Sequence, residues 1–275
     1  MRNYDILFLD IDGTLIGPDH FTLSPRNREA LLAAKEAGII LSIASGRCLH
    51  ILPQQAMDVG FDYAITSNGA AVDDLHSGQR IYTNGMSVQQ AELAYRLIRP
   101  HADFIEWFAN GHILLLQESY ALIHTHELPP WHAVYFAQGG TPVVESAEKY
   151  FAAGAPGLEK ISLVRYPREV IATVQQLLNA TGQFAVTHSI GRSLEIISAG
   201  CSKGAAIRKL CGQLGISLQR AAACGDAHND VSMLQTVGGS CAMGNAKPEI
   251  QAAAAFLTAP FDQDGVAEFI EKHVL

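Results

Sequence analysis

The sequence lacks the cysteine patterns that are typical of secreted or zinc-binding proteins. Its 275 residues include five cysteines, an odd number, and these form no CxxC pair. The first four residues lead directly into an apolar run, without the charged and hydrophobic regions of a secretory signal. This combination predicts reduced thiols and a cytoplasmic protein.

Long hydrophobic runs and an excess of positive charge are missing too. No apolar run approaches the roughly 20 residues of a membrane-spanning helix, so we expect no membrane partner. The chain carries 27 acidic and 19 basic residues, a net charge of -8, which argues against a nucleic-acid partner. A small phosphorylated metabolite remains possible as a partner, because local groups bind a phosphate whatever the net charge. The oligomeric state is unknown from the sequence.

Hydrophobic residues make up 48% of the chain, which is enough for a substantial core in one large domain or two. The other motifs of the chain are organised around the stretch YDILFLDIDGTL near the N-terminus. Its apolar run, residues 6–9, suits a strand that is buried on both faces. Asp10 and Asp12 follow. Because residues two apart in a strand point to the same side, their carboxylates would project together from the end of a central strand.

Two adjacent buried carboxylates need a cation, or a proton held by one of them, to persist. Burial and mutual repulsion disfavour their ionisation, and a hard divalent cation such as Mg²⁺ resolves that conflict. The pair then permits covalent phosphoryl transfer, in which one carboxylate attacks phosphorus and the other moves protons. The roles divide naturally between Asp10 and Asp12. The alternative is a solvated turn, because Asp, Gly and Thr are common turn residues.

The following segment has the pattern of a strand, helix, strand unit. Residues 25–37 are typical of a helix, and residues 39–44 of a second buried strand. Strands joined in this way run parallel and side by side, so Ser45 and Gly46 should reach the same sheet edge as Asp10. A hydroxyl there can hydrogen-bond a phosphoryl oxygen, or it can cap the next helix, and the two roles are compatible.

The pattern changes between residues 85 and 191. A helical pattern over residues 87–98 precedes strand-like runs, loops and a further helix. Helices mixed with antiparallel-type strands predict an α+β domain, distinct from the strand and helix alternation around it. We therefore predict an α/β protein with a core of residues 1–84 and 192–275 and an inserted α+β domain of residues 85–191.

After this domain the chain supplies further charged groups. Lys203 lies in the first turn of a predicted helix, where a cation opposes the helix dipole, so helix stabilisation does not explain it. The alternative is a solvated lysine. Residues 221–224 form a strand of small residues that ends in GDAHND, which contains Asp226, Asn229 and Asp230.

The motifs FLDIDGTL, SGR, SKG and GDAHND occur in the order found in haloacid dehalogenase-like hydrolases. With SNGA after a third predicted strand, the chain resembles their Cof-type sugar phosphatase subfamily over nearly its whole length. The resemblance implies a Rossmann-like three-layer core with a parallel sheet and a cap domain between the second and third motifs. It further implies an aspartyl-phosphate mechanism and Mg²⁺ as cofactor.

The resemblance also implies roles for single residues. Asp10 would be the nucleophile, Asp12 the acid/base, and Lys203 the charge partner of Asp10 and the phosphoryl group. Asp10, Asp226 and the backbone carbonyl of Asp12 would bind Mg²⁺, with Asp230 orienting the groups around it. Contacts to substrate or phosphate would come from Thr14, Ser45, Gly46, Asn68 and Asn229.

We therefore predict a Mg²⁺-dependent phosphatase that hydrolyses small phosphorylated metabolites, such as sugar phosphates. Two alternatives stay open. One is a phosphomutase or phosphotransferase of the same superfamily, which passes the phosphoryl group to a second hydroxyl. The other is a binding module that keeps the site without turnover. Sugar phosphates, flavin mononucleotide and pyridoxal phosphate are all compatible with the sequence as substrates.

Overall fold

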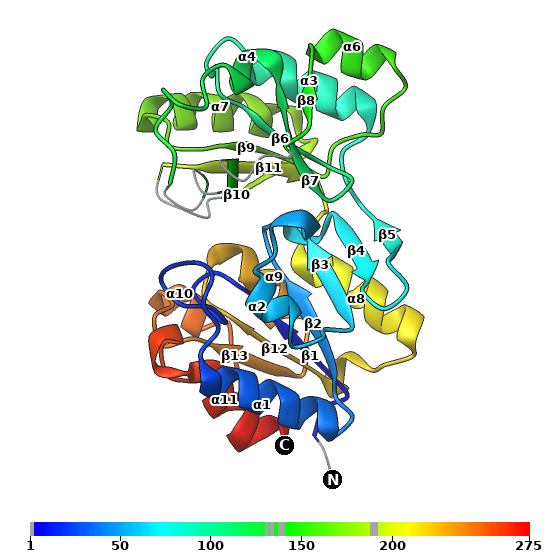
Figure 1. The fold of residues 1–275 in the computed structure, drawn as a ribbon, viewed down its shortest axis with the longest axis vertical. Helices are drawn as coiled ribbons and strands as arrows, with labels where there is room; N and C mark the ends of the chain where they lie inside the picture. The colour runs from blue at the N-terminus through cyan, green and yellow to red at the C-terminus, as the bar shows by residue number, and fades with distance from the viewer. Residues whose placement is uncertain (1–2, 130–131, 133–134, 137–140, 188–191) are drawn as a thin grey trace. The chain divides into compact units, whose positions relative to one another are not determined.

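The computed structural model describes residues 3–129, 132, 135–136, 141–187 and 192–275. The chain divides into two compact units, whose elements are labelled in Figure 1. The first unit comprises Met1–Arg47, Leu52–Tyr82 and Ser202–Leu275, and the second comprises Cys48–Ile51 and Thr83–Cys201. In the part of the chain that is described, no helix is long and apolar enough to cross a membrane.

The first unit is built on a sheet of eight strands in the order β14-β13-β12-β1-β2-β3-β4-β5 (Figure 1). β1 pairs in parallel with β12 on one side and with β2 on the other, and β4 runs antiparallel to β3. The four side chains of β1 are fully buried, as its continuous apolar run predicts. The strands are β1 (Ile6–Leu9), β2 (Ile40–Ala44), β3 (Tyr63–Thr66), β4 (Ala71–Asp74), β5 (Gln79–Thr83), β12 (Ala221–Gly225), β13 (Gly239–Ala242) and β14 (Phe256–Leu257).

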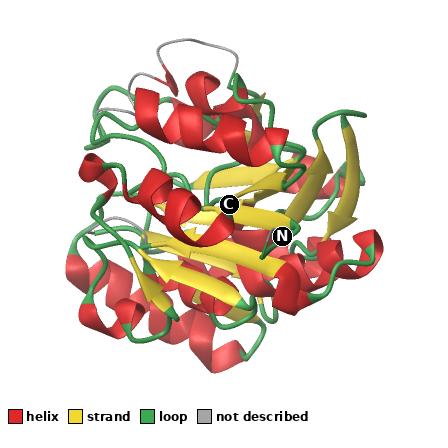
Figure 2. Ribbon diagram, turned by 90° about the horizontal axis from the view of Figure 1, so that it is seen from below, coloured by secondary structure: helices red, strands yellow, loops and turns green. Residues whose placement is uncertain are grey.

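Helices cover both faces of this sheet (Figures 1 and 2). α8 (Lys203–Leu214) and α9 (Val231–Leu234) pack on the face that carries Ile6 and Phe8. α1 (Pro25–Glu36) and α11 (Gly265–Phe269) pack together on the other face. Helices on both sides of a mostly parallel sheet confirm the predicted three-layer α/β core. The remaining helices of four or more residues are α2 (Gln54–Met57), α10 (Pro248–Gln251) and the π-helix Ile270–Val274.

The start of α1 illustrates how local sequence sets these elements. Ser24 is the N-cap, and its hydroxyl accepts a hydrogen bond from the backbone N–H of Asn27 at 3.1 Å. Pro25 occupies the first helical position, where its missing N–H costs nothing. The helix therefore begins where the Ser-Pro pair predicts.

The second unit has a sheet of six strands in the order β10-β11-β9-β6-β7-β8. Its strand pairs are antiparallel except for β7 with β8. This mixed arrangement is the α+β pattern that the sequence predicts. The strands are β6 (Glu106–Ala109), β7 (His112–Leu116), β8 (Val143–Val144), β9 (Lys160–Leu163), β10 (Phe184–Thr187) and β11 (Leu194–Ser198), and the helices are α3 (Val88–Ile98), α4 (Gln117–Tyr120), α6 (Ala147–Ala152) and α7 (Arg168–Thr181).

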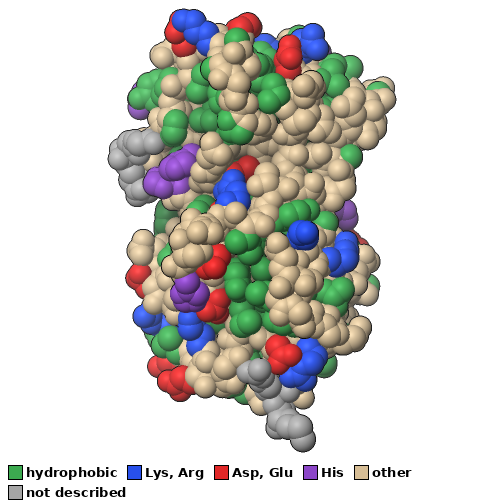
Figure 3. All heavy atoms as spheres, turned by 90° about the vertical axis from the view of Figure 1, so that its right-hand side faces the viewer, with side chains coloured by type: hydrophobic (Ala, Val, Ile, Leu, Met, Phe, Trp, Pro, Cys, Tyr) green, Lys and Arg blue, Asp and Glu red, His purple; other side chains and the backbone are tan. Residues whose placement is uncertain are grey.

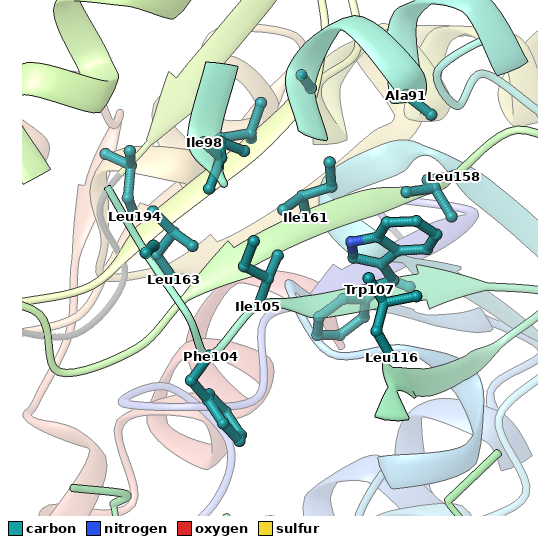
Figure 4. Packing of buried hydrophobic residues seen from close by; sticks show 14 of the residues in the cluster. Ala91, Ile98, Phe104, Ile105, Trp107, Leu116, Leu158, Ile161, Leu163 and Leu194 are labelled. Atoms are coloured by element: carbon teal, nitrogen blue, oxygen red, sulfur yellow. The ribbon is translucent and has the colours of Figure 1, made fainter. Parts of the chain in front are cut away.

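Trp107 is one of the large buried side chains in the apolar core of this second unit. Figure 4 shows its indole ring beside Leu158 and Leu116, and the side chain is fully buried. The rings of Tyr95 and Tyr150 meet it edge to face, with centroids 5.4 and 5.3 Å away. Aromatic pairs in this geometry add stability beyond the area that they bury.

The end of the second unit differs from the sequence-based boundary. Residues 192–201 belong to the second unit, whereas the sequence predicted a return to the core at residue 192. The physical reason is the pairing of β11, which forms antiparallel ladders with both β9 and β10. A strand with two partners in one sheet stays with that sheet.

Charges of both signs are interspersed on the face drawn in Figure 3. Several charged side chains of the first unit form exposed ion pairs, such as Arg26 with Glu271 and Arg220 with Asp5. Exposed pairs of this kind contribute little to stability. The buried ionisable groups described next are energetically more important.

Candidate active site

The candidate site lies where neighbouring strands of the first sheet end. β1 is followed by Asp10 and β12 by Asp226, and the register pairs Leu9 with Cys224. The backbone N–H of Asp10 donates to the carbonyl of Cys224 at 3.1 Å, which extends the ladder by one step. The parallel pairing therefore brings two acidic residues that are far apart in the sequence to the same sheet edge.

Asp10, Asp226 and Asp230 form an acidic cluster. Each offers one carboxylate oxygen, and these three oxygens lie within 4.8 Å of one another. Burial first, and then the neighbouring charge of Asp230, raise the pKa of Asp226 to about 7. The same two causes raise the pKa of Asp10 well above its ordinary value. These carboxyls therefore resist ionisation until positive charge is supplied.

A divalent cation fits this cluster chemically. Hard cations such as Mg²⁺ take oxygen ligands, and the donors here are carboxylate oxygens. Burial first, and then repulsion from Asp230, raise the pKa of Asp10 and of Asp226, so both carboxyls favour the protonated form. A cation at this position would favour the ionised form.

Lys203 provides part of the positive charge. Its ammonium group donates to Oδ1 of Asp10 at 2.7 Å and to Oδ1 of Asp230 at 2.6 Å, and its side chain is fully buried. Burial alone would lower the pKa of Lys203, but attraction to the two carboxylates outweighs it and raises the pKa above the ordinary value. The lysine is therefore charged at the start of α8, and two anions offset its clash with the helix dipole.

Asp230 holds the loop after β12. Its Oδ1 accepts from Lys203, and its Oδ2 accepts from the backbone N–H groups of Asp226 and Ala227, both at 2.9 Å. Because both oxygens are engaged with protein groups, Asp230 is better placed to orient Asp226 and Lys203 than to ligate an ion directly. This geometry suits the orienting role that the sequence predicts.

Gly13 and Thr14 approach Asp226 from the loop after β1. The hydroxyl of Thr14 donates to Oδ1 of Asp226 at 3.1 Å. Gly13 has φ of +77°, and a Cβ at this position would lie 2.4 Å from Oδ2 of Asp226. Only glycine combines this backbone conformation with such a close approach. The DGT part of the first motif therefore packs directly on the candidate metal ligand.

Asn245 is a contributor for which the sequence analysis proposed no role. Its side-chain amide donates to Oδ2 of Asp226 at 3.2 Å and to the carbonyl of Gly13 at 3.0 Å, and its Oδ1 accepts from the backbone N–H of Phe261. The GNA sequence after β13 was the available signal. Asn245 follows β13, which lies parallel to β12. Its place at the same sheet edge as Asp226 could therefore have been predicted.

Ser45 and Asn68 come from two further loops of the first unit, after β2 and β3, and Asn229 comes from the loop after β12. The hydroxyl of Ser45 accepts from the backbone N–H of Arg47 at 3.2 Å, and its carbonyl accepts from the N–H of Asn68 at 3.0 Å. The amide of Asn229 donates to Oδ1 of Asn68 at 2.9 Å. Asn68 itself has φ of +59°, a conformation that asparagine tolerates better than most residues. The structure thus links these predicted phosphate contacts to one another.

Asp12 has partners that the sequence analysis did not identify. The guanidinium of Arg47 donates from Nε to Oδ2 at 2.8 Å and from Nη2 to Oδ1 at 2.7 Å. The Nδ1 atom of His20 lies 2.7 Å from the same Oδ1. Burial would raise the pKa of Asp12, but these hydrogen bonds outweigh it and hold the pKa well below its ordinary value. Asp12 is therefore ionised in this arrangement.

Comparisons of the sequence and of the structure with known proteins agree on one family of hydrolases. A model of the haloacid dehalogenase-like hydrolase family matches residues 7–270. The 5-amino-6-(5-phospho-D-ribitylamino)uracil phosphatase YwtE of Bacillus subtilis (strain 168) is 28% identical over 280 residues, which cover 96% of each chain. The HMP-PP phosphatase of Shigella boydii serotype 4 (strain Sb227) is 30% identical over 248 residues, 88% of this chain and 89% of that protein. A crystal structure of a haloacid dehalogenase-like hydrolase from Bacteroides thetaiotaomicron is similar with a TM-score of 0.80 and 26% identity, over 98% of this chain and 99% of that one.

Proposed function

The chain belongs to the haloacid dehalogenase-like hydrolases, and from this premise we propose that it hydrolyses small phosphorylated metabolites through an aspartyl phosphate on Asp10, with Mg²⁺ as cofactor. Membership of the family confirms the resemblance drawn from the sequence motifs. The chain is a phosphoric monoester hydrolase, as its phosphatase relatives indicate.

The observation that carries the mechanism is the position of Asp10. Its carboxylate lies in the acidic cluster and receives a hydrogen bond from Lys203 on Oδ1. In the first step a carboxylate oxygen of Asp10 bonds to phosphorus while the bond from phosphorus to the ester oxygen breaks. The leaving oxygen takes a proton from Asp12. In the second step Asp12 removes a proton from water, which attacks phosphorus and releases inorganic phosphate and free Asp10.

Asp12 needs to be in the acid form for the first step and in the base form for the second. The ionised state supported by Arg47 and His20 is the base form. A bound phosphate adds negative charge nearby, and added negative charge raises the pKa of a neighbouring carboxyl. Substrate binding would thus favour the protonated form that the first step requires.

The site also contains groups that would hold Mg²⁺ and the phosphoryl group. Asp10, Asp226 and the backbone carbonyl of Asp12 would hold the ion, and Asp230 would orient Asp226. When bound, Mg²⁺ supplies positive charge that offsets the negative charge of the carboxylates and the phosphoryl oxygens. The phosphoryl oxygens would be contacted by Lys203 and by groups from the surrounding loops, namely Thr14, Ser45, Gly46, Asn68 and Asn229.

The relatives support the substrate class. By their names, they remove phosphate from 5-amino-6-(5-phospho-D-ribitylamino)uracil and from HMP-PP, which are small phosphorylated compounds. We extend this class, including sugar phosphates, to the present chain. We assign substrate selection to the inserted domain, residues 85–191, because the residues that would act on the phosphate all belong to the first unit, which leaves the inserted domain to recognise the rest of the substrate.

The test is phosphate release from p-nitrophenyl phosphate and a panel of sugar, nucleotide and cofactor phosphates, with Mg²⁺ and with excess chelator. We expect activity that requires Mg²⁺ and is lost in Asp10→Asn. Borohydride treatment during turnover should reduce the aspartyl phosphate to homoserine at position 10, detectable by peptide mass spectrometry. Activity that persists in Asp10→Asn would contradict the proposal. Transfer of the phosphoryl group to a second alcohol, without release of phosphate, would instead indicate a phosphotransferase.

A further inference from the structure

A loop between β1 and α1 brings a histidine to the carboxylate of Asp12. The side chain of His20 is 31% exposed, and its Nδ1 lies 2.7 Å from Oδ1 of Asp12. The backbone carbonyl of His20 also accepts a hydrogen bond from Nη2 of Arg47 at 3.0 Å. His20 therefore contacts both members of the Asp12 and Arg47 ion pair, once through its ring and once through its backbone.

The loop is built to hold His20 in this position. Its two ends are joined by a hydrogen bond from the N–H of Gly17 to the carbonyl of Thr22 at 2.8 Å. Inside it, Oδ1 of Asp19 accepts from the N–H groups of Phe21 and Thr22 at 3.0 and 2.9 Å. His20 has φ of +65°, which is uncommon for a residue with a side chain. A closed turn with this local bonding explains how the strained conformation persists.

Arg47, the other partner of Asp12, is held by burial of its side chain and by hydrogen bonds of its backbone. Its side chain is only 6% exposed. Its backbone N–H donates to the hydroxyl of Ser45, and its carbonyl accepts from the N–H of Ser67 at 2.8 Å. The fork of an arginine on a carboxylate sets the plane of that carboxylate. The imidazole adds a third contact, on Oδ1, so both carboxylate oxygens of Asp12 are held by neighbouring side chains.

From this geometry we propose that His20 is a positioning residue that acts through Asp12 and fixes the carboxylate for proton transfer to the leaving oxygen. The proposal rests on the proposed function, in which Asp12 is the acid/base. Holding a reacting group in one orientation lowers the entropic cost of reaching the transition state. Loss of the imidazole should therefore impair the step that needs Asp12 and spare steps that do not.

Two aryl phosphates separate these steps. Phenyl phosphate has a basic leaving oxygen that needs a proton as it departs, whereas p-nitrophenolate departs readily without one. The ratio kcat/KM reports the steps from free enzyme and substrate through departure of the leaving group. A defect in proton transfer by Asp12 should thus lower kcat/KM for phenyl phosphate and change the value for p-nitrophenyl phosphate little.

The variants are chosen to keep the backbone of the loop. His20→Gly removes the ring and tolerates positive φ, and His20→Asn also tolerates positive φ but keeps a donor near the place of Nδ1. We expect His20→Gly to lower kcat/KM about tenfold or more for phenyl phosphate and less than about threefold for p-nitrophenyl phosphate. His20→Asn should recover most of the loss. His76→Gly is the matched control, because His76 makes the same kind of contact with Asp62, at 2.8 Å, elsewhere in the first unit.

A double-mutant cycle tests whether His20 acts through Asp12. In an Asp12→Asn background, His20→Gly should change kcat/KM for either substrate by less than about twofold. Equal losses for both substrates in the single variant, or an undiminished loss in the Asp12→Asn background, would overturn the proposal and leave His20 a purely structural role. If the unmodified enzyme shows no activity that depends on Asp10, the proposed function falls first and the positioning role falls with it.

One measurement needs no active variant. The contact with Asp12 requires a proton on Nδ1 of His20, since a carboxylate oxygen can only accept. In ¹⁵N-labelled protein at neutral pH, the His20 resonance, assigned by its loss in His20→Asn, should show a protonated Nδ1. An unprotonated Nδ1 would contradict the proposal even if His20→Gly fails to fold.

Discussion

The ammonium group of Lys203 lies 2.7 Å from Oδ1 of Asp10, and both side chains are buried. The same ammonium bonds Asp230 at 2.6 Å, so one cation bridges a nucleophile candidate and the residue that holds the neighbouring loop. A buried cation with two anionic partners serves both the fold and the charge balance of the site.

Replacing Lys203 by methionine should damage both stability and activity. The change leaves Asp10 and Asp230 without their buried cation, and breaking a buried pair costs about 3 to 5 kcal/mol. Removing a charge that faces the transferred phosphoryl group should also lower kcat/KM about a hundredfold or more. Urea denaturation and kinetics with p-nitrophenyl phosphate measure the two effects. Lys209→Met, at an exposed position of the same helix, is the control, and a similar loss there would contradict the assignment.

Metal binding should depend on pH through Asp226. Its pKa is raised from 3.8 to about 7 in the folded chain, so the folded state holds this proton more tightly than the unfolded state does. In metal-free protein, the stabilising contribution of the protonated carboxyl is complete below 3.8 and is lost as the pH rises toward about 7. Mg²⁺ needs the ionised carboxylate. The increase in melting temperature on adding Mg²⁺ should therefore be larger near pH 8 than near pH 6, which lie about one unit above and below that pKa.

Asp226→Asn is the control for this pH dependence. The amide cannot ionise, so the variant should lose most of the Mg²⁺-induced increase in melting temperature at every pH. In chelator, its melting temperature should also fall less between low and neutral pH than that of the unmodified protein. An Mg²⁺ effect that does not change with pH, or that survives in Asp226→Asn, would show that the ion binds elsewhere.

Gly13→Ala should weaken metal binding more than its backbone strain explains. The new Cβ would lie 2.4 Å from Oδ2 of Asp226, and φ at this position is +77°. Gly78→Ala is a matched control, because Gly78 has φ of +70° and no atom lies within 4 Å of a Cβ built there. Each change should cost about 1 to 2 kcal/mol of stability through strain. The Mg²⁺ dissociation constant, measured by calorimetry, should rise in Gly13→Ala only, and an equal change in both variants would refute the close-contact explanation.

The sequence was most informative where acidic residues directly follow predicted strands. Asp10 and Asp226 could be placed together because parallel strands end at one edge, and the α/β core follows from apolar runs that alternate with a capped helix. The contacts of Asp12 were not predictable in this way. Arg47 lies within a recognised motif, but the direction of its side chain depends on packing. His20 sits in a loop without periodicity. Its positive φ leaves only a weak signal in the sequence, since few histidines adopt that conformation although histidine is enriched there among non-glycine residues.

The boundary at residues 192–201 was missed for a related reason. The sequence of β11 is compatible with a strand of either sheet, and only its pairing with β9 and β10 decides between them. Register in a sheet depends on long-range contacts, which a local pattern does not contain. Buried ionic contacts between strands of the second unit likewise could not be predicted, because they depend on the register of the strands.

Lys160 and Glu195, on the neighbouring strands β9 and β11, form a buried pair with Nζ 2.5 Å from Oε1 and side-chain exposures of 3% and 7%. Lys160→Met should destabilise the second unit by about 3 to 5 kcal/mol, because a buried carboxylate loses its cation. Replacing both partners, in Lys160→Met with Glu195→Leu, should restore most of that stability, since well-packed apolar groups can substitute for a buried ion pair. Denaturation monitored by the fluorescence of the chain's two tryptophans, Trp107 and Trp131, which both belong to this unit, measures both variants. Additive losses in the double variant would mean that each charge is held by other groups and that the pair is not an energetic unit.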